Sequence, residues 1–155
     1  MFLKSYVVTK RPFRIRSVCW HGENNCRAIG NDALRALGQD RFFKKKEAGD
    51  RHREFAYEGK SMSVSIHGVW RPLKDKGGLS RGVLKDTDLM LVPAENMFHP
   101  EAKAFRMVDA ELWKDEKAMK LLREHQEAGR VVYVRPDMST AELRGEILKR
   151  LKRLE

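Results

Sequence analysis

Residues 31–46 combine a polar cap, an apolar stripe, a glycine and a run of cations, which is the pattern of a helix-turn-helix segment that binds DNA. Asn31 is expected to cap the first helix, and Gly38 to supply the left-handed turn that ends it. A second, basic helix would then face the phosphates of a duplex, because Lys and Arg bind phosphate by releasing counterions. The residues predicted to contact nucleic acid are Arg35, Arg41, Lys44, Lys45, Lys46 and Lys60. The alternative is an ordinary surface helix followed by a solvated run of charges.

A second group of residues has the types that cleave a phosphodiester bond. Histidine and glutamate transfer protons near neutral pH, and lysine stabilises the extra negative charge on the phosphate during cleavage. The candidate catalytic residues lie around a predicted hairpin and are His52, Glu54, Lys60 and His67. A small nuclease is therefore the alternative function, and it would use a divalent metal ion to cleave DNA.

Cys19, His21 and Cys26 bring two thiols and an imidazole within eight residues, which raises the question of zinc. A structural zinc site needs four ligands, and the fourth would have to be the distant His52 or His67. We therefore expect no metal and no other cofactor in a binding protein. Two cysteines in a 155-residue chain without a secretory signal pattern favour reduced thiols over a disulfide.

The composition favours a polyanionic partner. Lys and Arg outnumber Asp and Glu by 32 to 22, which gives a formal net charge of +10. The excess is concentrated in residues 1–60, where 14 basic residues accompany 7 acidic ones. Nucleic acid is the expected partner, DNA ahead of RNA, and a membrane surface is not expected.

Several function classes lack their motifs in this sequence. It contains no glycine-rich phosphate loop of the nucleotide-binding types and no Gly-x-Ser-x-Gly motif of serine hydrolases. No window approaches the roughly 20 apolar residues that cross a bilayer. The N-terminus also lacks the order of a secretory signal, so we expect a cytoplasmic location.

The elements that must position the basic residues belong to the first part of the chain. Strands are predicted at 2–8 and 13–20, and the second would place Arg14 and Arg16 on one face. A hairpin is predicted at 53–66, because serine and apolar residues alternate strictly after a Glu-Gly-Lys turn. One face of its second strand should be buried and the serine face wet. If the hairpin is the wing of a winged helix, Lys60 lies at its tip.

The second part of the chain is more helical. Residues 71–88 are rich in glycine and charge and are predicted to form a mobile loop. Buried strands are expected at 89–93 and 131–134, with helical sequence between them. A final amphipathic helix begins at the capping box of Ser139 and Glu142, and its leucine stripe is either core or a dimer seam.

We expect an α+β fold with a small mixed sheet, a helix-turn-helix-like segment, a β-hairpin and a C-terminal amphipathic helix. Residues 1–95 would form a basic nucleic-acid-binding part, and residues 96–155 a helical part packed on it. One domain over residues 1–155 is the alternative.

Several short motifs resemble, in the right order, the Bro-N domain of phage antirepressors and viral Bro proteins. They are Ile15–Val18, His21–Glu23, Asp32–Gly38, Met62–Val64, Gly68–Trp70 and Ala102–Arg106. The resemblance implies an α+β DNA-binding module that acts in regulation or replication, with no catalytic residues.

Three hypotheses follow from the sequence. The first is a non-enzymatic protein of phage or prokaryotic origin that binds double-stranded DNA in regulation or replication. The second is the small nuclease. The third is a protein interaction module that docks a partner, or a second copy of the chain, through the leucine face of the C-terminal helix.

Overall fold

The structure is a computed structural model that describes residues 11–18, 23–44, 51–68, 70–71, 78–94 and 110–154. The predicted strand at 2–8 lies outside these ranges, and so do Lys45, Lys46, Cys19 and His21. The Bro-N-like motif at 102–106 also lies outside them.

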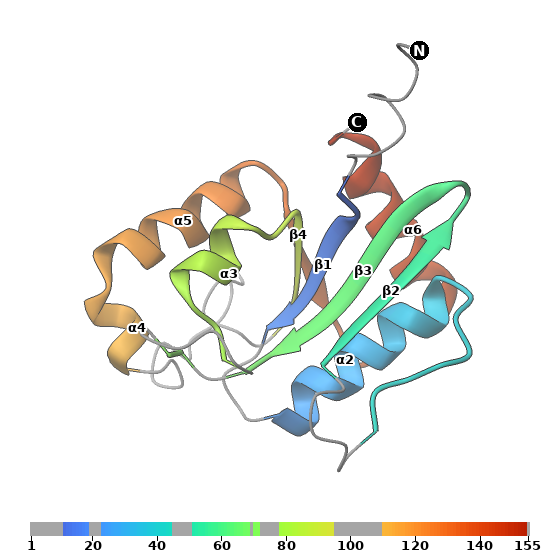
Figure 1. Cartoon of the computed structure of the whole chain (residues 1–155), viewed down its shortest axis with the longest axis horizontal. Coiled ribbons are helices and arrows are strands. Elements are labelled where there is room, and N and C mark those ends of the chain that lie inside the picture. The colour runs from blue at the N-terminus through green and yellow to red at the C-terminus, as the bar shows by residue number, and fades with distance from the viewer. Residues whose placement is uncertain are drawn as a thin grey trace, which may run out of the picture.

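The described strands form one five-stranded sheet in the order β2-β3-β1-β4-β5 (Figure 1). The strands are β1 (Phe13–Val18), β2 (His52–Tyr57), β3 (Lys60–His67), β4 (Leu89–Pro93) and β5 (Val131–Val134). Strands β3, β1, β4 and β5 are parallel, and β2 runs antiparallel to β3 as the first strand of a hairpin. The predicted mixed α and β fold is confirmed, together with its mixed sheet and its hairpin.

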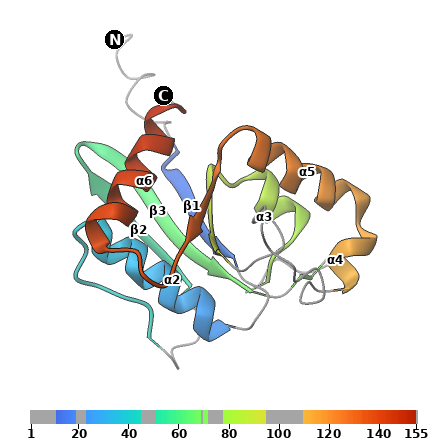
Figure 2. The same cartoon turned by 180° about the vertical axis from the view of Figure 1, so that it is seen from behind.

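Helices cover both faces of the sheet. They are α2 (Glu23–Ala36), α3 (Arg81–Lys85), α4 (Ala110–Lys114), α5 (Glu116–Glu127) and α6 (Thr140–Lys152). Helices α2 and α6 share one apolar core with Ile15, Val64 and Leu91. Helices α3, α4 and α5 share a second core with Val18 and Met90 on the other face. Accordingly, α6 passes behind β3 in Figure 1 and in front of it in Figure 2.

The alternation of side chains along β3 produces two very different faces. Met62, Val64 and Ile66 point into the core with α2. Ser63 and Ser65 point to the other face, where they are also buried. The prediction of a wet serine face is therefore wrong at these two positions. At Ser65, Nη1 of Arg16 from the neighbouring strand β1 donates to the serine hydroxyl at 2.9 Å.

The prediction of a helix-turn-helix is wrong over the described residues. One continuous helix, α2, begins eight residues before Asn31, and residues 39–44 contain no helix. Asn31 therefore lies inside a helix and caps nothing. The turn at Gly38 is confirmed, because this glycine has a φ of 75° and its N–H donates to the Arg35 carbonyl at 3.0 Å.

The second part of the chain joins the same sheet. Strand β5 pairs with β4, so the two parts expected from the sequence share one sheet. The predicted loop at 71–88 is helical at α3, which Ser80 caps and which buries Val83 and Leu84. The capping box of α6 is confirmed.

The leucine stripe of α6 packs into the core. Its residues Leu143, Ile147 and Leu151 are buried in the cluster that α2 also enters. Of the two roles expected for this stripe, the core is therefore the one observed, and the homodimer stays a prediction.

Candidate nucleic-acid interface

A clamp holds the segment after α2 in place. The side-chain oxygen Oδ1 of Asn31 accepts the Phe43 N–H at 2.7 Å, and its Nδ2 donates to the Phe43 carbonyl at 3.1 Å. These two bonds satisfy the backbone of a residue that belongs to no helix or strand. The sequence pattern suggested a helix cap because an Asn side chain bonds backbone groups equally well at both kinds of site.

Gly30 lets the clamped residue pack closely. The ring of Phe43 is buried, and a Cβ built on Gly30 would lie 3.2 Å from it and 2.8 Å from Cγ2 of Ile66. A side chain at position 30 would force its neighbours to shift, so the glycine lets α2, β3 and Phe43 pack closely at this point.

Four basic residues lie on or beside the clamped segment. Arg41 and Lys44 are exposed on it. The guanidinium of Arg35 lies 5.0 Å from the centre of the Phe42 ring, and that of Arg53 lies 5.7 Å from the Phe43 ring. We call Arg35, Arg41, Lys44 and Arg53 the basic ridge.

Two of the ridge arginines, Arg35 and Arg53, have further partners among the described residues. Arg35 also pairs with Asp32, with 3.2 Å between Nη1 and Oδ1, so its charge is partly balanced. Arg53 donates from Nη2 to the Phe42 carbonyl at 3.1 Å, which fixes it to the segment. Sequence reasoning missed Arg53, although the alternation in β2 places it on the same face as Phe55 and Tyr57.

The structure brings part of the predicted nucleic-acid set together. Arg35, Arg41 and Lys44 lie on the ridge. Lys60 lies at the start of β3, whereas Phe43 packs beside Ile66, and six residues of strand span about 20 Å. Lys60 therefore stands apart from the ridge, beside α6 residues Leu148 and Leu151.

The predicted catalytic set is not assembled into one site. His52 and Glu54 are neighbours on one face, with 3.1 Å between Nε2 and Oε1. Lys60 shares the opposite face with Met62, which packs in the core with α2.

His67 lies on the same face as His52, but both of its ring nitrogens are engaged. Nδ1 lies 3.0 Å from the Gly78 carbonyl, and Nε2 lies 2.9 Å from Nη1 of Arg16. Because a guanidinium can only donate, Nε2 must accept and Nδ1 must carry the proton. Burial and the charge of Arg16 lower the pKa of His67 to about 4. It is therefore a neutral structural base without a free nitrogen to offer a substrate.

The face of the sheet that carries His67 is polar across three strands. Two rows cross it, Arg14–Ser63–Glu54 and Arg16–Ser65–His52. We call these six residues the polar face. The prediction that Arg14 and Arg16 share one face is confirmed.

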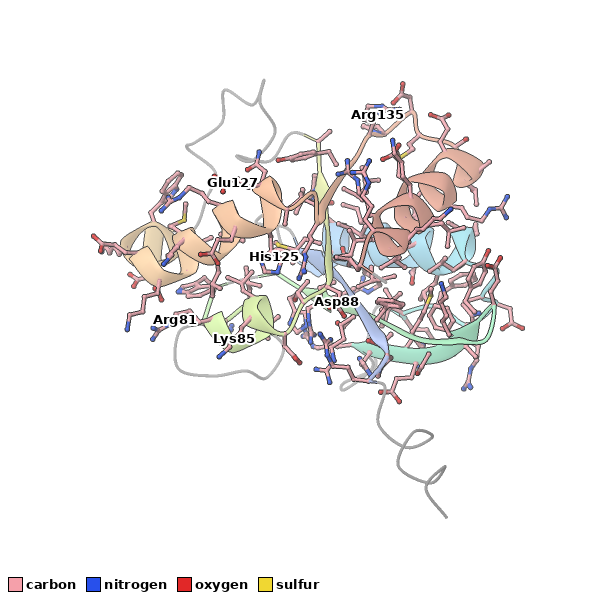
Figure 3. The ribbon with its side chains drawn as sticks, turned by 90° about the horizontal axis from the view of Figure 1, so that it is seen from above. Arg81, Lys85, Asp88, His125, Glu127 and Arg135 are labelled. Atoms are coloured by element: carbon pink, nitrogen blue, oxygen red, sulfur yellow. The ribbon has the colours of Figure 1, made fainter. Side chains whose placement is uncertain are left out.

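Ion pairs tie the polar face to the chain before β4. Arg11 donates to both carboxylate oxygens of Asp88, at 2.8 and 3.0 Å, and Asp88 also accepts the Arg14 N–H at 2.8 Å. Figure 3 shows Asp88 beside β1. Arg14 and Arg16 both approach Asp86.

The expectation of reduced thiols is wrong at Cys26. Cys26 is disulfide-bonded, and Cys19 is the other cysteine of the chain. The sulfur of Cys26 is buried in the first turns of α2, and in a disulfide it cannot act as the thiolate ligand that zinc requires. In the ranges that the structure describes, no group of three or more His, Cys, Asp or Glu is placed to hold a metal ion.

No protein-family model matches this chain, and no curated protein matches it. Among the described helices, none has the length and apolar character needed to cross a membrane.

Proposed function

We propose that the protein binds double-stranded DNA without cleaving it, and that the basic ridge contacts the phosphates. The observation that supports this proposal is the clamp. It holds a segment with two exposed cations, Arg41 and Lys44, against a rigid helix and between two further guanidiniums. Because the clamp fixes the backbone of this segment, its cations lose less backbone conformational entropy when they meet a phosphate.

The ridge favours contact with the backbone of a nucleic acid over reading of its bases. Its described segment contains no helix that could enter a major groove, and arginine and lysine bind phosphate oxygens in any sequence. The net charge of +10 adds a long-range attraction to the same partner. A role in regulation or replication rests on the Bro-N resemblance alone and is part of the proposal.

The test is a binding titration of the whole chain against labelled duplex DNA, single-stranded DNA and RNA of one sequence, at about 50 and about 200 mM salt. The double variant Arg41→Ala/Lys44→Ala should bind the duplex more weakly. The slope of its log affinity against log salt should be shallower by about 2, because each phosphate contact adds about 0.9.

Lys120→Ala/Arg123→Ala is the matched control, because it removes two cations from exposed positions on α5. It should keep the parent slope. An unchanged slope in the ridge variant would overturn the ridge as the contact surface. Tighter binding to single strands or to RNA would overturn the assignment to duplex DNA.

A further inference from the structure

We propose that Arg14 and Arg16 form a binding site for a phosphate group on the polar face, and that the carboxylate of Asp86 occupies this site when the ligand is absent. The site lies on the opposite face of the sheet from the basic ridge and does not depend on DNA binding. Its ligand is inorganic phosphate or the phosphate of a small phosphomonoester.

The two guanidiniums converge on a single oxygen. Nη1 of Arg14 contacts Oδ2 of Asp86, and Nη2 of Arg16 lies 3.7 Å from the same atom. Planar forks of N–H donors that meet at one point are the arrangement that binds phosphate oxygens, and a carboxylate oxygen takes the same place.

Among the residues that the structure describes, few carboxylates lie near this pair. Asp88 is bound by both terminal nitrogens of Arg11, so Asp86 is the carboxylate that Arg14 and Arg16 share. Glu54 lies in the row of Arg14 but two strands away, about 10 Å across the sheet, and it pairs with His52.

The other described groups that contact Arg16 are uncharged. Its Nη1 donates to Ser65 Oγ at 2.9 Å and to the neutral His67. Burial and the nearby charge of Arg14 lower the pKa of Arg16 to about 10, while Asp88 acts in the opposite direction. A doubly charged anion would balance the pair better than one shared carboxylate does.

Solvent reaches the site from the side of Asp86. The side chains of Asp86 and Arg14 are 44% and 32% exposed, and that of Arg16 is 12% exposed. Asp86 follows α3 as its C-terminal cap, and the cap uses its backbone N–H, so the side chain can rotate away without opening the helix. A phosphate can then take its place between the guanidiniums.

The experiment measures the affinity for inorganic phosphate and for adenosine monophosphate by titration calorimetry with the whole chain. Asp86→Asn removes the competing carboxylate and should tighten phosphate binding about tenfold, a change of about 1.4 kcal/mol. Arg14→Gln should abolish binding. Asp137→Asn removes a carboxylate from another exposed pair, with Arg135, and should leave the affinity unchanged.

Thermal unfolding of each variant verifies that it is folded, and Arg16→Lys is a second probe of the arginine pair should Arg14→Gln fail to fold. The proposal is overturned if Asp86→Asn binds phosphate no more tightly than the parent chain, or if Asp137→Asn tightens binding equally. Retention of binding in a folded arginine variant also overturns it. Tighter binding of adenosine monophosphate than of phosphate would support a phosphomonoester ligand, and equal binding would support free phosphate.

Discussion

His67 shows how neighbouring groups can fix the protonation of one side chain. Its folded-state pKa is about 4, compared with 6.5 in an unfolded chain, because burial and Arg16 disfavour the imidazolium. Above about pH 6.5 the residue is neutral in both states, and its full contribution to stability is present. Between about pH 6.5 and about pH 4 the unfolded chain binds a proton that the folded chain does not. The free energy of unfolding therefore decreases as the pH falls through this range.

We therefore expect that the free energy of unfolding depends more steeply on pH in the parent chain than in His67→Gln. The difference in slope should approach about 1.4 kcal/mol per pH unit near pH 5, since one proton is involved. Urea unfolding at several pH values measures it. The exposed His52→Gln is the control, and parallel curves for the parent and His67→Gln would contradict the assignment.

Asn31 acts on the ridge through Phe43. Asn31→Ala leaves the Phe43 N–H and carbonyl without these partners, and we expect it to lower the free energy of unfolding by about 2 kcal/mol. It should also weaken duplex binding although every ridge cation is retained, because the segment loses its fixed position. Urea unfolding and the DNA titration measure the two effects. A loss of stability with unchanged DNA affinity would show that the clamp does not position the ridge.

At the scale of elements, the close contact between α2 and β3 depends on Gly30, which has no side chain. Gly30→Ala adds a methyl group 2.8 Å from Ile66 Cγ2, and the resulting shift should destabilise the fold by about 1–3 kcal/mol. This cost exceeds the gain in helix propensity of about 1 kcal/mol.

Gly145→Ala in α6 is the matched comparison, because a Cβ there meets nothing within 4 Å. It should stabilise the protein by up to about 1 kcal/mol. Urea unfolding of both variants gives the two signs. The same sign in both would show that crowding at Gly30 does not decide the outcome.

Local patterns predicted the elements that local interactions define. The capping box located α6 because both partners of the box lie within four residues, and strict alternation located β3. The prediction of a helix-turn-helix is wrong because the limits of α2 depend on packing against the distant sheet and not on local residue types. Asn24 and Asn25 have turn composition, yet they belong to a helix whose buried side Cys26, Ile29 and Ala33 create by packing on the sheet.

At the scale of the whole molecule, the pairing of distant strands was beyond the sequence. Parallel neighbours such as β1 and β4 lie some 70 residues apart in the sequence, and no residue pattern within either strand identifies the strand that it pairs with. The candidate site was therefore predicted only in part. Arg41 and Lys44 carry a visible signal in the sequence, whereas Arg53 joins them through the packing of the hairpin on α2.

The disulfide at Cys26 also bears on the whole molecule. Disulfides persist in oxidising compartments, so this bond does not favour the cytoplasmic location expected from the sequence, which stays a prediction. Reduction should lower the free energy of unfolding by about 2–4 kcal/mol. Thermal unfolding with and without dithiothreitol, together with a thiol count, measures this. Two reactive thiols in the untreated protein would contradict the bond.

Strand β2 lies at one edge of the sheet, which affects the solubility of variants. An edge strand offers unpaired backbone donors and acceptors to any other chain and can seed fibrils. Here Arg53 and Glu54 place charge along that edge, and charged side chains on an edge strand oppose its pairing with another chain. Variants that remove these charges in search of function will therefore tend to precipitate, and lost solubility must not be mistaken for lost binding.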